Sequence, residues 1–81
     1  MIAPEQCRAA RGWLDWSQQD LADRAHVSLS TVRDFEKGRR SPIQNNLTAI
    51  RLSFEMAGIS FLFRGDVPLG IQAGSPNVAN L

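Results

Sequence analysis

The sequence contains one cysteine, one histidine and no tyrosine, and it has no long apolar run. Cys7 has no second cysteine to pair with, which is typical of a reducing compartment, and its position in an apolar stripe predicts a buried structural thiol. A single histidine, His26, without a cluster of other ligands argues against a metal site. No stretch approaches the ~20 apolar residues of a membrane span, and no signal peptide opens the chain. We therefore expect a cytoplasmic protein that binds no metal and no cofactor.

The chain also lacks the side-chain combinations on which enzymes most often depend. It contains no evident nucleophile–base pair, no carboxylate pair in a plausible cleft and no glycine-rich phosphate loop, so we predict that it is not an enzyme. Its net charge of +1 is weak evidence for any anionic partner. The distribution of charge is more informative, because phosphate binding requires a local basic patch and not a basic total. Between residues 33 and 40, the acids Asp34 and Glu36 are outnumbered by Arg33, Lys37, Arg39 and Arg40.

A chain of 81 residues has the size of one domain, and its residue pattern is mainly helical. Apolar residues at helical spacing predict four helices, at about residues 4–14, 18–25, 29–37 and 46–57. Ser17, with Asp20 three residues later, forms the pattern of a capping box before the second helix. Ser28 and Asn45 are the expected N-caps of the third and fourth helices.

The pattern changes after Gly58, where residues 59–63 (ISFLF) are apolar and favour a β-strand. Residues 65–68 favour a turn, and residues 69–72 are expected to form a return strand. The predicted fold class is therefore mainly α, with four helices followed by a short C-terminal β-strand or hairpin. We place the helical domain at residues 1–58, the β segment at residues 59–72 and a flexible tail at residues 73–81.

The stretch from Gln18 to Gly38, QQDLADRAHVSLSTVRDFEKG, predicts two short helices joined by a tight turn. Such a pair presents its second helix outward on a scaffold, as in proteins that insert a helix into the major groove of DNA. The chain resembles the phage-repressor and Cro-like (XRE-type) helix-turn-helix family over about residues 5–58. The resemblance is carried by Arg11, Ser17-Gln18, Leu21-Ala22, Val27-Ser28, Thr31-Val32, Phe35-Glu36, Gly38, Arg40, Pro42 and an amphipathic fourth helix. The run AGISFLF is similar to small bacterial regulators of this type that add a C-terminal strand.

One position departs from the family pattern. His26 stands in the turn where the family usually has glycine, and histidine tolerates a left-handed backbone better than most residues do. We therefore interpret His26 as a turn residue and not as a ligand or a base. The resemblance also implies an ion pair between Arg11 and Glu36, which ties the first helix to the end of the third. The alternative is that Arg11 reaches a phosphate.

The resemblance implies that the helix beginning at Leu29 enters the major groove of double-stranded DNA and reads base edges near its N-terminus. In the family register, the base contacts are Leu29, Ser30, Thr31, Arg33 and Asp34. Arg33 is the best candidate for a bidentate contact to guanine, whereas Asp34 accepts from a cytosine amino group or orients Arg33. Phosphate contacts, which position the protein without reading sequence, are expected from Gln18, Ser28, Lys37, Arg39, Arg40 and Asn45. The alternative for each of these side chains is simple solvation at the surface.

One domain of this size makes few contacts with DNA, and the family solution is a two-fold dimer on a palindrome. The β segment is the natural dimerisation element, with Ile59, Phe61 and Phe63 at the interface, because a lone hairpin is marginal and leaves an open edge. The alternative is a hairpin folded back over the core of its own chain. Trp13 and Trp16 flank the end of the first helix and are predicted to cover the edge of the core.

Together these features predict a sequence-specific DNA-binding transcriptional regulator, a repressor of its own or a neighbouring promoter that binds a palindromic operator as a homodimer. The alternative is a helix-turn-helix protein-interaction module, an antiactivator or antitoxin that sequesters another protein. The near-zero net charge, the acids of the third helix and the apolar segment 59–63 motivate this alternative, since a fold does not determine a function. A specific mobility shift with DNA discriminates between the two.

Overall fold

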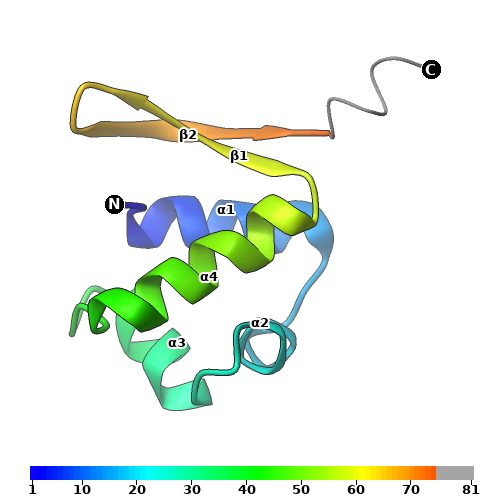
Figure 1. The fold of residues 1–81 in the computed structure, drawn as a ribbon, viewed down its shortest axis with the longest axis vertical. Helices are drawn as coiled ribbons and strands as arrows, with labels where there is room; N and C mark the ends of the chain where they lie inside the picture. The colour runs from blue at the N-terminus through cyan, green and yellow to red at the C-terminus, as the bar shows by residue number, and fades with distance from the viewer. Residues whose placement is uncertain (75–81) are drawn as a thin grey trace.

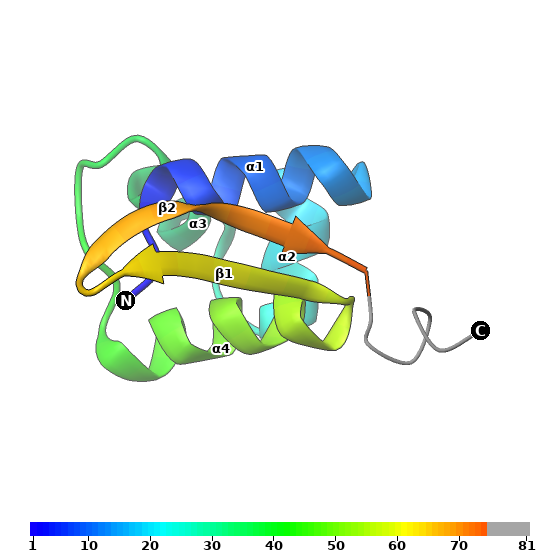
Figure 2. The same ribbon diagram turned by 90° about the horizontal axis from the view of Figure 1, so that it is seen from above.

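The computed structural model describes residues 1–74 and contains four helices followed by an antiparallel hairpin. The elements are α1 (Pro4–Leu14), α2 (Gln18–Ala25), α3 (Leu29–Glu36), α4 (Gln44–Met56), β1 (Ile59–Arg64) and β2 (Val67–Ala73). The hairpin lies over α1 and α4, with β2 against α1 and β1 against α4, while α2 and α3 lie on the opposite side of these two helices (Figures 1 and 2). The predicted fold class, mainly α with a C-terminal hairpin, is confirmed. Within residues 1–74, no helix is long and apolar enough to span a membrane.

The hydrophobic core draws on every element, including both ends of the described chain. Its largest fully buried side chains are Phe54, Leu21, Ile50 and Ile59. Phe54 is central, because its ring stacks on Trp16 with 5.5 Å between the ring centroids and meets Phe61 edge to face at 5.9 Å. Offset-stacked and edge-to-face arrangements are the favourable geometries for aromatic pairs. This aromatic column therefore joins the segment before α2, helix α4 and the hairpin into one core.

Local capping explains why α2 and α3 begin where they do. The Ser17 hydroxyl accepts from the backbone N–H of Asp20, and the Asp20 carboxylate accepts from the backbone N–H of Ser17, each at 2.9 Å. At α3, the Ser28 hydroxyl accepts from the backbone N–H of Thr31 at 3.1 Å. The turn between the helices passes through His26, whose φ of 57° and ψ of 42° are left-handed. The predicted caps Ser17 and Ser28 and the interpretation of His26 as a turn residue are confirmed.

Two predictions for the helical part are wrong. Helix α4 begins at Gln44 with Ile43 as its N-cap, and no side chain caps it. Asn45 lies inside the first turn, so its side chain cannot take the N-cap position that we predicted. Trp13 is 68% exposed and does not cover the core edge. The inward stripe of α1 passes through Leu14, and the adjacent position on a helix is turned by about 100°, which directs Trp13 toward solvent.

The hairpin is longer and more closely integrated than we predicted. Strand β2 begins at Val67, so the turn is confined to Gly65 and Asp66, and it ends at Ala73, which we had assigned to the flexible tail. Residues 75–81, the remainder of that predicted tail apart from Gly74, lie outside the described residues. The strand register shifts between Leu62 and Phe63, which marks a bulge.

The position of Ile59 corrects the predicted dimer interface. Ile59 is only 2% exposed and belongs to the core of its own chain, and Phe61 packs against that core. Ile59 and Phe61 therefore follow the alternative that we considered, in which the hairpin folds back over the core of its own chain. Phe63, at 37% exposed, is the most accessible member of the predicted set. The reason is geometric: the hairpin lies flat on α1 and α4, so the inward side chains of β1 are covered.

A side chain that no sequence pattern indicated attaches the hairpin to α1. Gln6 is 3% exposed, and its amide nitrogen donates to the carbonyl oxygens of Leu62 at 3.0 Å and Gly70 at 2.9 Å. Its amide oxygen accepts from the backbone N–H of Ala3 at 2.9 Å. One buried amide thus satisfies backbone groups on both strands and at the start of α1, which a buried polar group requires.

Candidate nucleic-acid interface

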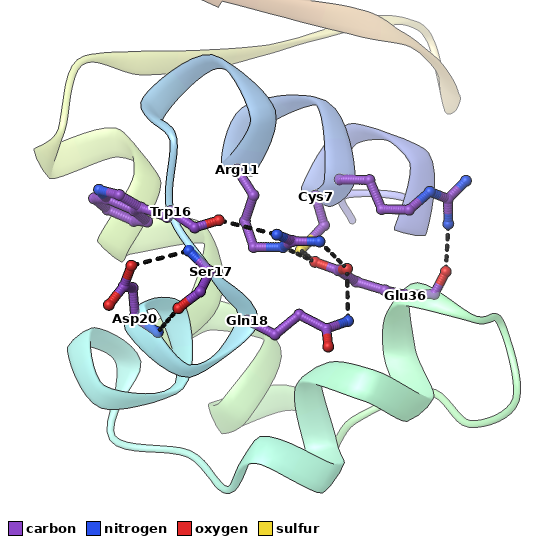
Figure 3. A network of polar contacts seen from close by, with 8 residues as sticks. Cys7, Arg11, Trp16, Ser17, Gln18, Asp20 and Glu36 are labelled. Atoms are coloured by element: carbon purple, nitrogen blue, oxygen red, sulfur yellow. Dashed lines mark hydrogen bonds and ion pairs between the residues drawn. The ribbon is translucent and has the colours of Figure 1, made fainter.

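The C-terminal end of α3 is held by a buried polar cluster built on Glu36, which is 3% exposed (Figure 3). Its carboxylate accepts from Arg11 Nε and Nη2, each at 2.7 Å, in a bidentate pair. It also accepts from the Gln18 amide at 3.1 Å and from the Cys7 thiol at 3.2 Å. These donors come from α1 and from the first residue of α2. The Glu36 carboxylate therefore connects three helices at one point.

The cluster keeps Glu36 ionised despite its burial. Burial by itself raises the pKa of Glu36, but the hydrogen bonds from Arg11, Gln18 and Cys7 outweigh it and hold the pKa below its ordinary value. Burial, together with the neighbouring carboxylate, raises the pKa of Cys7, so this residue stays a neutral thiol that donates a hydrogen bond. The expectation of a buried structural thiol is confirmed, since Cys7 is free and fully buried.

Arg11 is fully engaged inside the protein. Its third guanidinium nitrogen, Nη1, donates to the carbonyl oxygen of Trp16 at 2.9 Å, which fixes the segment between α1 and α2. The hydrogen bond to Glu36 raises the pKa of Arg11 further above its ordinary value. Arg8, one turn earlier, donates to the main-chain oxygen of Glu36. With all three of its nitrogens used internally, Arg11 has the geometry of a scaffold residue and not that of a phosphate ligand.

The opposite side of α3 is turned toward solvent. Val32, Phe35 and Glu36 are buried, whereas Ser30 and Arg33 are exposed. The remaining predicted base contacts, Leu29, Thr31 and Asp34, are half-buried at the borders of the exposed side. The structure thus brings the five predicted base-contact residues together on the outer half of a single short helix. We call this set, Leu29, Ser30, Thr31, Arg33 and Asp34, the outer face of α3.

Hydroxyl groups gather at the N-terminal end of this outer face. The Ser28 hydroxyl lies 3.1 Å from that of Ser30 and 2.8 Å from that of Thr31. Ser28, which we expected to contact phosphate, is therefore occupied as the cap of α3. Gln18 is similarly shared, because its amide bonds to Glu36 from the first position of α2. Both residues nonetheless lie at helix N-termini, where backbone N–H groups and the helix dipole favour anions.

A basic loop follows the outer face of α3. Lys37, Arg39 and Arg40 are exposed, and the ion pairs present within residues 1–74 are Arg11–Glu36 and Arg51–Glu55. The cations of the loop and Arg33 are therefore not neutralised by a paired carboxylate in the described part of the chain. A hollow of about 240 Å³ separates α3 from the loop and is lined by Ser30, Thr31, Asp34, Arg40, Ser41, Pro42, Ile43 and Asn46. Asn45 is exposed beside it on the first turn of α4.

The comparison with known families agrees with this geometry. A family model described as helix-turn-helix matches residues 8–52, which is more than half of the chain. The protein belongs to the XRE-type helix-turn-helix family. This family consists of DNA-binding regulators. The matched residues run from α1 into α4, so they include Glu36 with its partners Arg11 and Gln18, and the outer face of α3, whereas Cys7 lies just before the match. No curated protein matches the chain.

Several residues that support the scaffold behind the candidate interface could not be recognised from the sequence. Gln6, and the inward hydrogen bond of Gln18, did not follow from periodicity, because polar residues at helical spacing ordinarily indicate a solvated face. Arg8 also resembles an exposed helix residue in the sequence, although its guanidinium reaches the end of α3. Gln6 lies next to Cys7 within α1, and only the position of the hairpin shows that the amide is covered.

Proposed function

We propose that this helix-turn-helix protein is a transcriptional repressor that binds a palindromic operator in double-stranded DNA as a homodimer. In this proposal residues 1–58 are the DNA-binding domain, and the β segment at residues 59–72 contributes to dimerisation. The single observation that carries the DNA-binding part is the contrast within α3. Its inner side is held by a hydrogen-bonded ionic cluster, while its outer face presents Arg33, which forms no ion pair within residues 1–74, beside a basic loop.

The base contacts that we propose are the five residues of the outer face of α3. Arg33 donates in a bidentate manner to guanine O6 and N7, and such a pair contributes about 1–3 kcal/mol of discrimination against a wrong base. Asp34 accepts from a cytosine amino group or holds Arg33 in position. Leu29 contacts a thymine methyl group, and the hydroxyls of Ser30 and Thr31 contact bases or nearby phosphates.

The phosphate contacts come from two sides of α3. Gln18 and Ser28 lie at the starts of α2 and α3, where backbone N–H groups assist them. Lys37, Arg39 and Arg40 follow α3 in the basic loop, and Asn45 lies in the first turn of the next helix. These contacts set the register of the protein on the duplex and make its affinity depend on salt. Regulation would then depend on operator affinity and on protein concentration.

A second candidate function is supported by a different surface. Exposed apolar side chains are present on α4, where they include Leu52 and Met56, and on the hairpin, where they include Leu62, Val67 and Leu69. The hairpin lies on the side of the molecule away from α3 (Figure 1). A protein partner sequestered there would make this chain an antiactivator or an antitoxin. Such a function predicts binding of a protein without binding of a specific DNA sequence.

A mobility-shift assay on the DNA upstream of the protein's own coding sequence, at physiological salt, tests the proposal. We expect a specific shift that Arg33→Ala and Arg39→Ala weaken. The matched control is Arg64→Ala, because Arg64 is an exposed arginine at the end of β1, and the hairpin lies away from α3 (Figure 1). All three variants remove one positive charge, so a loss confined to the first two assigns the effect to the α3 region.

The two arginines are expected to differ in how they act. Arg33→Ala relaxes the sequence preference in selection of bound DNA from a random pool, because it removes a base contact. Arg39→Ala weakens binding to all sequences and lowers the slope of log affinity against log salt by about 1. Absence of any sequence-specific shift, with selection from the random pool yielding no preferred sequence, would contradict the regulator and leave the protein-binding function.

A further inference from the structure

The outer side of α1 and the neighbouring part of β2 enclose a groove of about 500 Å³. It is lined by Ala3, Glu5, Gln6, Ala9, Pro68, Leu69 and Gly70. Trp13, which is 68% exposed, follows Ala9 by four residues and lies on the same side of α1. The molecule therefore carries a large exposed aromatic side chain and an apolar groove on one continuous surface, which we call the α1 face.

Trp13 does not fill the groove of its own chain, because it is not among the lining residues and is 68% exposed. It is fixed to α1 about 6 Å further along the helix axis than Ala9, given a rise of about 1.5 Å per residue. Its exposure shows that no part of residues 1–74 covers it. A tryptophan side chain buries 150–250 Å² in a typical core or interface, so leaving it in water forgoes a large apolar contribution. An exposed aromatic side chain beside an apolar groove is therefore typical of an interaction surface.

We propose that the occupant of this groove is Trp13 from a second copy of the chain, in a symmetric interface between two α1 faces. A two-fold axis perpendicular to α1 and level with Ala9 places the two α1 helices antiparallel. Trp13 follows Ala9 by four residues and Glu5 precedes it by four, so the axis brings the partner's Trp13 level with Glu5. Glu5 lines the groove, and each chain thus fills the groove of the other.

The chemistry of the two surfaces is complementary. The indole N–H of tryptophan is a donor without an acceptor function, and the exposed Glu5 carboxylate at the groove is an acceptor. At the centre of the face, Ala9 is small, and nothing lies within 4 Å of the position that a Cβ atom of Gly12 would occupy. Two helices can therefore approach closely there. Antiparallel helices also place the positive end of one helix dipole beside the negative end of the other.

The arrangement is compatible with the proposed operator binding, on which the inference otherwise does not depend. The hairpin and α3 lie on opposite sides of α1 (Figure 1), and the axis runs from the hairpin side to the α3 side. A rotation about this axis therefore leaves the outer faces of both α3 helices on the same side of the dimer. One duplex can then contact both, as a palindrome requires.

Pairing between strand edges, the other way of joining two hairpins, is less compatible with the observed strands. Pro68 lies in β2 opposite Phe63 and has no backbone N–H to donate to an added strand. The register shift between Leu62 and Phe63 interrupts the ladder at the same place. Bulges and prolines are the devices by which edge strands avoid such pairing. The side-chain surface of α1 and β2 is thus the better candidate for the interface.

A cysteine cross-link tests the proposal directly, because a residue beside a two-fold axis meets its own copy. The Ala9→Cys variant is expected to form a covalent dimer under mild oxidation, as shown by non-reducing electrophoresis. The control is Ala57→Cys, at an exposed residue that caps the end of α4. The wild-type protein controls for cross-linking through Cys7. Because Cys7 is fully buried, the wild-type protein is expected to run as a monomer in the gel. Equal cross-linking of the two variants, or none of Ala9→Cys, would overturn the proposal.

Sedimentation velocity over a range of concentrations supplies a second readout without DNA. We expect Trp13→Ala to shift the monomer–dimer midpoint to at least about tenfold higher concentration, since buried tryptophans are frequent hot spots. Met56→Ala is the control, because Met56 is 88% exposed on α4 and lies outside the α1 face, and it is expected to leave the midpoint unchanged. Circular dichroism verifies that both variants are folded. If the wild-type protein dimerises and Trp13→Ala does not weaken the dimer, this interface is refuted. A failed mobility shift, in contrast, bears on the DNA-binding function alone.

Discussion

The two sides of α3 differ in almost every physical respect, although the helix has only eight residues. On the inner side, Glu36 is buried and accepts hydrogen bonds from Arg11, Gln18 and Cys7. On the outer side, Ser30 and Arg33 are exposed, and no ion pair involves Arg33 within residues 1–74. The inner side sets the orientation of the helix, and the outer face is left free to contact another molecule.

This separation has a consequence for how substitutions act. A change on the inner side leaves a buried charge or donor without its partner, and the cost appears as lost folding stability. A change on the outer face removes no internal contact of comparable strength, so its cost appears in binding. The following predictions are arranged from the largest expected effect to the smallest, and each can break or sharpen this contrast.

The largest effect is expected for Glu36→Ala. It removes the acceptor of Arg11 and leaves that charge poorly compensated at a largely buried site, at a cost of about 3–5 kcal/mol of the free energy of unfolding. The matched variant on the outer face, Asp34→Ala, is expected to change stability by less than about 0.5 kcal/mol. Urea unfolding of both variants measures the difference. Similar losses for the two would show that the inner and outer sides are not energetically distinct.

A double-mutant cycle between Arg11 and Glu36 is expected to give a coupling energy of about 0.5–3 kcal/mol, as residues in direct contact do. The single variants are Arg11→Met and Glu36→Gln, which preserve much of the side-chain volume. The control cycle pairs Arg51 with Glu55, an exposed i,i+4 ion pair on α4, where about 0.3–0.5 kcal/mol is expected. Additive effects at Arg11 and Glu36 would exclude a structural role for the pair.

Removing the two helix caps is expected to have an effect of intermediate size on stability. Ser28→Ala and Ser17→Ala each remove the hydroxyl that accepts from a backbone N–H at the start of a helix, and each is expected to cost about 1 kcal/mol of stability. Only Ser28→Ala loosens the N-terminus of α3, so it alone should reduce discrimination between operator and mismatched DNA. If Ser17→Ala relaxed discrimination equally, the outer face would not be the part of the molecule that reads sequence.

The smallest expected effect concerns acid. The folded-state pKa of Glu36 lies below its ordinary value of 4.5, so this carboxylate stabilises the fold fully above that pH. Its contribution is lost as the pH falls below 4.5 and through the folded-state pKa. Thermal unfolding between pH 3 and 7 should therefore show a weaker acid dependence for Glu36→Gln than for the wild type. A steeper dependence in the variant would mean that the pKa of Glu36 is raised in the folded state.

Much of the helical part of the fold could be predicted because its signals are local. Ser17 and Asp20 are three residues apart, and Ser28 bonds to Thr31 over the same interval. The left-handed turn at His26 concerns a single residue between two recognisable helices. In such cases the interacting groups are close in the sequence, so residue type and spacing nearly determine the contact. The start of α4 was not predicted correctly because no side chain caps this helix, so the sequence carries no capping residue to mark it.

The candidate site was predictable only in part, for the same reason. The family pattern indicates which residues of α3 point outward, but those residues remain predicted DNA contacts until binding is measured. The internal partners of Glu36 come from α1 and α2, and Gln18, the donor from α2, looked in the sequence like an ordinary polar residue at a helix start. The exposure of Trp13 and the burial of Ile59 were both predicted incorrectly, because each depends on whether a distant element covers the residue.

The sequence by itself therefore determined the order of the elements, the caps of α2 and α3, and membership of the helix-turn-helix family. Only the tertiary structure decided that the hairpin closes over α1 and α4, that Gln6 bonds across to Leu62 and Gly70, and that a groove remains open beside Ala9. The two Gln6 hydrogen bonds join residues more than fifty positions apart. No local spacing constrains such pairs, and they form because the packed core brings the two ends of the chain together.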